Sequence, residues 1–179
     1  MQPVAAFVVR EGAEPDIPQI VDLLEAVAAE GRWIARELPI DRQEVSQRLA
    51  GALASERVVH YVAVAHGEVV GHAAAEISGY GVADLGMSVA RSWRRRGVGS
   101  ALLDSAVGWA RRVGAHKVAL QLWPHNVAAH RLYEKFGFVQ EGVLRRHYRR
   151  SNGELWDAVV MGLVLDEEAP GFPAGTADA

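Results

Sequence analysis

Hydrophobic residues recur along this chain with two different periods, and the changes of period divide it into helices and strands. Apolar residues at helical spacing predict four helices: from Ile17 up to Gly31, after Asp41 as far as Leu53, over 97–113 and over 126–136. Alternating or continuous apolar runs predict seven strands: 4–10, 58–65, 69–77, 82–89, 117–122, 138–148 and 154–165. The order β-α-α-β-β-β-α-β-α-β-β predicts one mixed α/β domain with a strand–helix–strand crossover in its middle.

Short polar motifs mark where several of these elements begin or turn. Asp16 is in position to cap the first helix, and Asp41 with Glu44 three residues later resembles a capping box for the second. Residues 66–68 and 151–153 contain the glycines of two hairpin turns. These motifs define element ends independently of the hydrophobic pattern.

The composition is that of a soluble globular protein. Of 179 residues, 50% are hydrophobic and 23% are charged, and the net charge of −3 argues against nucleic acid as a partner. The absence of cysteine excludes disulfides and cysteine nucleophiles, and no stretch approaches the roughly 20 apolar residues of a membrane span. We therefore expect a cytoplasmic protein with no membrane partner. A composition rich in Pro, Gly, Ala and acids predicts a disordered tail over 166–179, leaving a single domain over 1–165.

The segment 89–100 carries the main chemical signal. It leaves a strand, passes through three arginines and two glycines, and enters a helix. Glycines allow a ligand to approach the backbone, and the first amides of a helix are free donors at the positive end of its dipole. The segment is therefore suited to a phosphate or pyrophosphate. The alternative for such a segment is a packed turn with a solvated basic face.

Other motifs for phosphate, nucleophilic and metal chemistry fit less well. The two lysines, Lys117 and Lys135, are not in a P-loop setting, and Leu102 occupies the third small position of a dinucleotide fingerprint. Residues 86–90 approximate a nucleophile elbow, but the helical pattern begins about nine residues after the serine. The seven histidines show no metal-ligand spacing, so we expect no metal site.

Two motifs taken together resemble the GCN5-related N-acetyltransferase (GNAT) superfamily. The first reads Arg94-x-x-Gly97-x-Gly99, and the second, 27 residues later, reads Asn126-x-x-Ala129-x-x-x-Tyr133 and closes in Gly137-Phe138. The resemblance covers most of the chain. It implies a mixed, mostly antiparallel central sheet of about seven strands, helices on both faces and a β-α-β core that binds coenzyme A.

The resemblance also implies how acetyl-coenzyme A, the acetyl donor, is bound. In that superfamily one strand pairs with the pantetheine arm, the glycine turn binds the pyrophosphate, and the second motif contributes an asparagine beside the pantetheine and a tyrosine beside the sulfur. Here these positions are Met87, Ser88, Val89, Arg94, Arg95, Arg96, Gly97, Val98, Gly99, Ser100, Asn126 and Tyr133. Arg95 stands where the superfamily often has glycine. The implied reaction is direct attack by an amine in a ternary complex, for which no thiol carrier is needed.

Proton transfer needs a base for the amine and an acid for the leaving thiolate. Tyr133 is the candidate acid; its alternative is a core aromatic residue. Asp84 matches the acidic residue of the phosphinothricin-acetyltransferase-like branch, although it is shorter than the usual glutamate; Glu76 and solvent are the alternatives, and Asp84 could also be only a strand-end carboxylate. Gln121 occupies the base position of another branch and cannot serve.

The acceptor is the least defined partner. In the superfamily the segment between the first two helices and the last hairpin enclose the acceptor, which makes Trp33, Arg36, Glu37 and Tyr148 candidates. The ending of the chain resembles that of bacterial acetyltransferases acting on amino acids, so we expect a small primary amine. The alternatives are a protein or peptide N-acetyltransferase and a non-catalytic acyl-coenzyme-A-binding module. Homodimers are common in the superfamily, and the sequence leaves the oligomeric state open.

Overall fold

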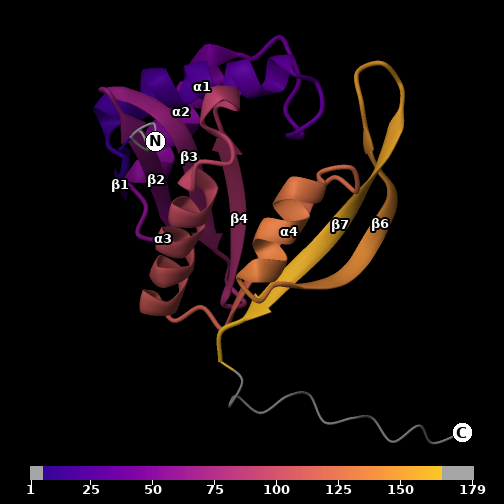
Figure 1. Cartoon of the computed structure of the whole chain (residues 1–179). Helices are drawn as coiled ribbons and strands as arrows, with labels where there is room; N and C mark the ends of the chain where they lie inside the picture. Colours follow the sequence, from indigo (N-terminus) through magenta and orange to yellow (C-terminus); the bar gives the residue numbers. More distant parts are fainter. Residues whose placement is uncertain (1–5, 167–179) are drawn as a thin grey trace, which may run out of the picture.

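The computed structural model describes residues 6–166, which form a seven-stranded sheet with two helices on each face (Figure 1). The strand order is β1-β2-β3-β4-β5-β7-β6, and β4–β5 is the parallel pair among antiparallel neighbours. The strands are β1 (Val8–Glu11), β2 (Val58–Ala65), β3 (Glu68–Ile77), β4 (Val82–Val89), β5 (Lys117–Leu122), β6 (Val139–Arg149) and β7 (Leu155–Val164). The helices are α1 (Ile17–Ala29), α2 (Arg42–Leu53), α3 (Val98–Arg112) and α4 (Val127–Lys135), with short 3-10 turns η1 (Glu14–Asp16) and η2 (Arg91–Trp93).

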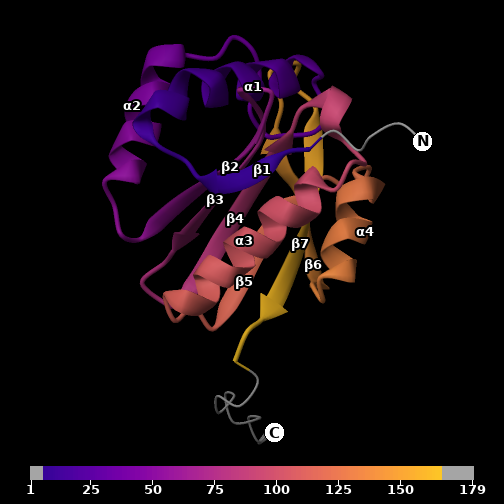
Figure 2. The ribbon, with the colours of Figure 1, turned by 60° about the vertical axis from the view of Figure 1, so that its left-hand side comes forward.

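Two hydrophobic cores lie on opposite faces of this sheet. One packs α1 and α2 against β2 and β3, and the other packs α3 and α4 against the reverse face (Figures 1 and 2). Fully buried residues such as Ile20 in α1 and Leu102 in α3 form the centres of the two cores. The predicted mixed sheet with helices on both faces is confirmed.

The crossover β4–α3–β5 leaves one backbone edge of β4 open. β4 pairs with β3 along its whole length, whereas its pairing with β5 covers 82–84 against 117–119. Beyond Asp84 the two strands diverge, and α4 lies beside the opening (Figure 1). Residues 85–89 therefore have backbone donors and acceptors directed toward α4 that no strand of the described chain pairs with.

A β-bulge changes the register of the β2–β3 hairpin. Ala65 pairs with Glu68 and Val64 with Val69, but Ala63 pairs with Gly71, so Val70 is an extra residue in β3. Side chains alternate between the two faces of the sheet along a strand. One extra residue therefore moves every later side chain of that strand to the opposite face. The bulge thereby places His72, Ala74 and Glu76 on the face covered by α1 and α2.

Most of the sequence-predicted end motifs are present. Asp41 accepts a hydrogen bond from the Glu44 amide at 2.9 Å, and Asn126 accepts one from the Ala129 amide at 3.3 Å. α4 ends with Gly137 at a φ of 88° and a Phe138 amide bonded to the Tyr133 carbonyl at 3.1 Å, which is a Schellman ending. The expected segments 4–5 and 167–179 lie outside the described residues.

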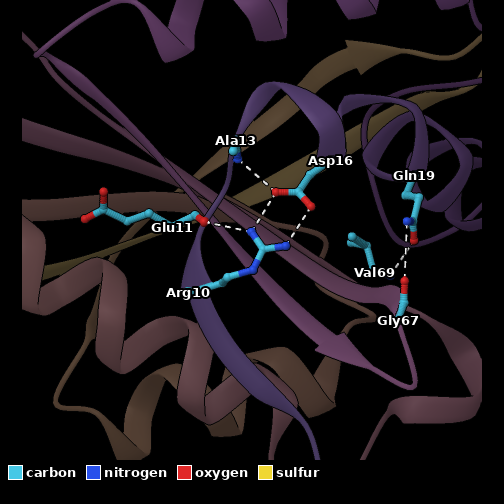
Figure 3. A network of polar contacts seen from close by, with 7 residues as sticks. All are labelled: Arg10, Glu11, Ala13, Asp16, Gln19, Gly67 and Val69. Atoms are coloured by element: carbon cyan, nitrogen blue, oxygen red, sulfur yellow. Dashed lines mark hydrogen bonds and ion pairs between the residues drawn. The ribbon is translucent and has the colours of Figure 1, made fainter.

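The prediction that Asp16 caps α1 is wrong. Asp16 lies in η1 with helical backbone angles, and its carboxylate makes no hydrogen bond to the first turn of α1. The carboxylate instead accepts from the preceding Ala13 amide at 2.8 Å and from both terminal nitrogens of Arg10 (Figure 3). The fork of Arg10 lowers the pKa of Asp16 below its usual value. Gln19 makes a second local link, accepting from the Val69 amide and donating to the Gly67 carbonyl (Figure 3).

Candidate active site

Two cavities meet where β4 diverges from β5. The first, of about 480 Å³, lies between β4, the glycine turn and α4; the second, of about 860 Å³, lies between the sheet and the α1–α2 layer. Both are lined by Ile34, Gln121 and residues 85–88. Two ligands can therefore approach β4 from two sides and meet at this segment.

Most of the residues expected to bind the coenzyme line the first cavity. They are Met87, Ser88, Val89, Arg94, Arg95, Gly97, Gly99, Ser100, Asn126 and Tyr133. Two others do not present their side chains there: Val98 is 1% exposed in the core, and the Arg96 guanidinium lies 5.3 Å from the Trp93 ring centroid. Their backbone amides, at the start of α3, are the groups placed for the predicted pyrophosphate site.

The glycine turn has the left-handed backbone that its sequence requires. Gly97, the N-cap of α3, has a φ of 87°, which L side chains rarely adopt. Arg95 also has a positive φ, of 61°, so the position where the superfamily often carries glycine is left-handed here and holds an arginine. Gly99, in the first turn of α3, lies against Leu132 and Met87.

Arg94 connects this turn to the end of α1. Its Nε donates to the Val89 carbonyl at 3.1 Å, and its two terminal nitrogens bind the two carboxylate oxygens of Glu30, which also accepts from Trp33 Nε1 at 2.7 Å. Arg94, and to a smaller extent the Trp33 indole, lower the pKa of Glu30 below its usual value. The Arg94 guanidinium thus has an anionic partner within the chain, and it holds the turn in place beside the cavity.

Tyr133 is buried in the wall of the first cavity. Its side chain is 6% exposed and its ring lies 5.5 Å from that of Phe138. Burial raises its pKa to about 12, so the phenol stays protonated at neutral pH. Its hydroxyl has no hydrogen-bond partner within residues 6–166, which leaves its proton available to a ligand in the cavity.

The two acidic candidates lie in the second cavity. Asp84 and Glu76 are direct cross-strand partners on β4 and β3 and face α1 and α2. Partial burial, and secondly the negative charge of Glu76, raise the pKa of Asp84 above its usual value. Two residues further along β4, Gly86 lines both cavities.

Three of the four expected acceptor residues line a cavity. Trp33 and Tyr148 line the first, where the Tyr148 hydroxyl donates to Gln121 Oε1 at 2.9 Å, and Arg36 lines the second. Glu37 lines neither, so the interpretation of Glu37 as a cavity residue has no support. Its carboxylate accepts from the amide and hydroxyl of Ser151, each at 2.9 Å.

Glu37 instead belongs to a clasp between the α1–α2 segment and the last hairpin. Arg150, 5% exposed, donates to the Ala35 carbonyl at 2.9 Å and lies 3.4 Å from the Glu37 carboxylate. Its guanidinium carbon also lies 4.6 Å from the Trp156 ring centroid. The clasp fixes the segment that carries Trp33 and Arg36.

Sequence reasoning missed a histidine pair in the second cavity. His60 of β2 and His72 of β3, each 6% exposed, stack with centroids 5.2 Å apart, and His60 Nδ1 lies 2.9 Å from His72 Nε2. Burial, and secondly the charge of Arg48 for His60 and of His60 for His72, lowers the pKa of each ring. The sequence does show a histidine within each of two apolar strands. However, the register between β2 and β3 is needed to know that the two side chains lie on the same face and in contact.

The histidine pair predicts a loss of stability in acid. His72 has a pKa of about 3 against 6.5 when unfolded, so the unfolded chain takes up a proton that the folded chain excludes. The free energy of unfolding is therefore unaffected above pH 6.5 and falls by about 1.4 kcal/mol for each pH unit below it. Between pH 7.5 and pH 4.5, the free energy of unfolding should fall by about 2–3 kcal/mol less in His72→Gln than in the parent. Urea unfolding followed by circular dichroism measures this difference. Parallel curves for the two proteins would contradict it.

The comparisons with known proteins agree with this geometry. A family model described as the acetyltransferase (GNAT) family matches residues 23–138, more than half of the chain. The chain belongs to the GNAT family of acetyltransferases. The predictions of that family, of an acyltransferase class and of acetyl-coenzyme A as the donor are confirmed at the level of the family.

Individual GNAT relatives differ in what they act on. The L-amino acid N-acetyltransferase AaaT of Escherichia coli K12 is 34% identical over 111 residues, 58% of this chain and 66% of the relative, which is less than two thirds of its length. The ribosomal protein bS18-alanine N-acetyltransferase of the same strain is 25% identical over 120 residues, 67% of this chain and 80% of the relative.

A solved GNAT structure shares the fold. The phosphinothricin acetyltransferase of Sinorhizobium meliloti, in complex with acetyl-coenzyme A, superposes with a TM-score of 0.81 over 96% of each chain at 18% identity. Within residues 6–166, no group of three His, Asp or Glu side chains is placed to hold a metal ion. Over the same range no helix is both long and apolar enough to span a membrane.

Proposed function

We propose that this chain transfers the acetyl group of acetyl-coenzyme A to the primary amine of a small molecule, an amino acid or an amino-acid-like compound. The observation that carries the proposal is the junction of the two cavities at 85–88. The first cavity has the glycine turn and a protonated tyrosine, and the second has two carboxylates. The amine attacks the thioester directly in a ternary complex.

On the coenzyme side, the open edge of β4 supports pairing of Met87 and Val89 with the pantetheine amides as an added strand. The amides of residues 95–100 are placed at the N-terminus of α3, where a pyrophosphate is favoured. Because Glu30 already binds Arg94, we assign Arg94 to positioning the turn and Arg95 to direct contact. Asn126 lines the cavity beside the pantetheine path, and Tyr133 donates a proton to the leaving sulfur.

On the acceptor side, Asp84 is the proposed base. Its raised pKa makes it a better proton acceptor than an ordinary carboxylate, and a water molecule between it and the amine compensates for its short side chain. Glu76, its cross-strand partner, is the second candidate, and its charge helps to raise the pKa of Asp84.

The clasp favours a small acceptor over a protein. It ties to the last hairpin the α1–α2 segment whose Ile34 and Arg36 line the second cavity, and so limits how far that wall can open for a peptide. The name of AaaT supports an amino acid, and the name of the bS18-alanine enzyme supports the second candidate, a protein N-terminus. A cytoplasmic location and a homodimer stay predictions.

The proposal is tested by thiol release from acetyl-coenzyme A across a panel of amino acids, polyamines, aminoglycosides and N-terminal peptides. We expect turnover with one or more free amino acids that exceeds turnover with peptides. Turnover confined to peptides would move the acceptor to the protein class. Tight coenzyme binding in calorimetry without turnover of any amine would favour a non-catalytic acyl-coenzyme-A-binding module.

Replacing the base candidate gives a pH-dependent prediction. We expect Asp84→Asn to lower turnover about three- to tenfold below pH 8 and to recover partly above it, where more of the amine is free. Glu76→Gln, on the neighbouring strand, is the parallel variant at the second candidate base. A pH–rate profile of Asp84→Asn that matches the parent would transfer the role to Glu76 or to solvent.

A further inference from the structure

The second cavity has a basic wall that the proposed chemistry leaves unexplained. Arg36, from the α1–α2 segment, and Arg48, from α2, both line it. Neither guanidinium makes a hydrogen bond or ion pair with any residue of the described chain. Arg36 is half-buried and Arg48 is exposed.

Placing two unpaired guanidinium groups together is unfavourable unless an anion joins them. Burial, and secondly the charge of Arg48, lower the pKa of Arg36, and Glu44 only partly opposes this. A carboxylate bound between the two arginines would cancel their repulsion and accept charge-assisted hydrogen bonds from the forks. The chain itself supplies no such carboxylate within residues 6–166.

The floor of the cavity sets the distance from this wall to the reacting segment. Cross-strand register aligns His60, Ala74 and Gly86 in one row across β2, β3 and β4. The charge of Arg48 acts on His60, at the β2 end of the row, and Gly86, at the other end, lines both cavities. Two strand spacings separate the backbones of His60 and Gly86 by about 10 Å, so an α-amino acid at Gly86 meets the arginines only where their long side chains extend over Ala74 toward β4. The small residues Ala74 and Gly86 leave the floor clear between them.

The cavity therefore has charges of opposite sign on different walls. Asp84 and Glu76 form the cross-strand pair next to Gly86 on the same face, where a protonated amine would be attracted. Arg48, whose charge acts on His60, lies toward the β2 side. This polarity is complementary to a zwitterion. A neutral or purely cationic amine would leave the arginines unpaired.

We infer that Arg36 and Arg48 form the anion subsite of the acceptor pocket and hold the carboxylate of an amino-acid acceptor while its amine lies at Gly86. The inference rests on the proposed function and adds the residues that select an acceptor with a carboxylate. The two arginines line the second cavity and not the first, so their anion comes from the acceptor and not from the coenzyme.

The test compares acceptors that differ only in the anion: L-methionine, L-methioninamide and 3-(methylthio)propylamine, with the equivalent phenylalanine series. In the parent, the free acid should have the highest kcat/KM. Arg48→Met and Arg36→Met should each raise KM for the acid about five- to tenfold, change kcat less than twofold, and leave the amide, the decarboxylated amine and acetyl-coenzyme A unaffected. Taking each variant relative to the parent on the same acceptor cancels differences in amine basicity.

Controls separate the possible failures. Arg111→Met, on the exposed opposite side of the molecule in α3, removes the same charge and should change nothing, and Arg48→Lys should restore part of the loss. Thermal unfolding shows which variants are folded. Equal losses on acid and amide would overturn the anion subsite and leave the acetyltransferase proposal intact. Absence of turnover with every amine overturns both.

Discussion

Turnover of Tyr133→Phe is expected to fall roughly 10- to 1,000-fold, with acetyl-coenzyme A affinity within a fewfold of the parent. Burial raises the pKa of Tyr133 to about 12, so it holds its proton throughout any practical assay range and can donate it to the departing thiolate. Phenylalanine keeps the contact with Phe138 and removes only the hydroxyl. Single-turnover kinetics at saturating substrates measures the effect on the chemical step.

Tyr61→Phe is the matched control for this experiment. Tyr61 is as buried as Tyr133, at 6% exposure, and belongs to the same core, but its hydroxyl accepts from Arg112 at 2.9 Å and lines neither cavity. We expect it to lose some stability and keep its turnover. Full activity of Tyr133→Phe, with chemistry shown to be rate-limiting, would return Tyr133 to a packing role.

Gly99→Val is expected to weaken acetyl-coenzyme A binding at least tenfold, about 1.4 kcal/mol. A Cβ at this position would lie 3.2 Å from Leu132 Cδ2 and 3.6 Å from Met87 Cε, so the branched side chain has to extend into the first cavity. Isothermal titration calorimetry measures the change in affinity.

Gly108→Val, in the same helix, is the control for the general cost of a β-branched residue in α3. A Cβ there meets only the flexible end of Arg112, at 3.5 Å, and the position lines neither cavity. We expect Gly108→Val to lose stability and keep its affinity. Unchanged affinity in a folded Gly99→Val protein would remove the turn from the coenzyme site.

The sequence was sufficient for the elements and for the coenzyme-binding motifs, because both are encoded locally. The period of the hydrophobic residues predicted both ends of β2, β4 and β5 to the exact residue. The spacing of the glycines predicted the turn before α3. Asp41 and Asn126 act as caps because a cap needs only the next three residues.

Long-range partners could not be derived in this way. An ungapped register for the hairpin pairs His72 with Tyr61 and puts it on the opposite face from His60; the bulge at Val70 reverses this. Similarly, Glu30 binds Arg94 and Glu37 binds Ser151 because the α1–α2 segment folds back over β4 and the last hairpin. These contacts join residues that are 64 and 114 positions apart.

The strand order has a consequence for how the protein is made. β7 lies between β5 and β6, so β6 has no partner in the described sheet until β7 has been synthesised. During translation, β1–β4 and the glycine turn leave the ribosome well before Leu155–Val164 do. A nascent chain therefore has an exposed edge at β5 and lacks the clasp. The α1–α2 segment is therefore tied to the last hairpin only at the end of synthesis, after the rest of the sheet has been made.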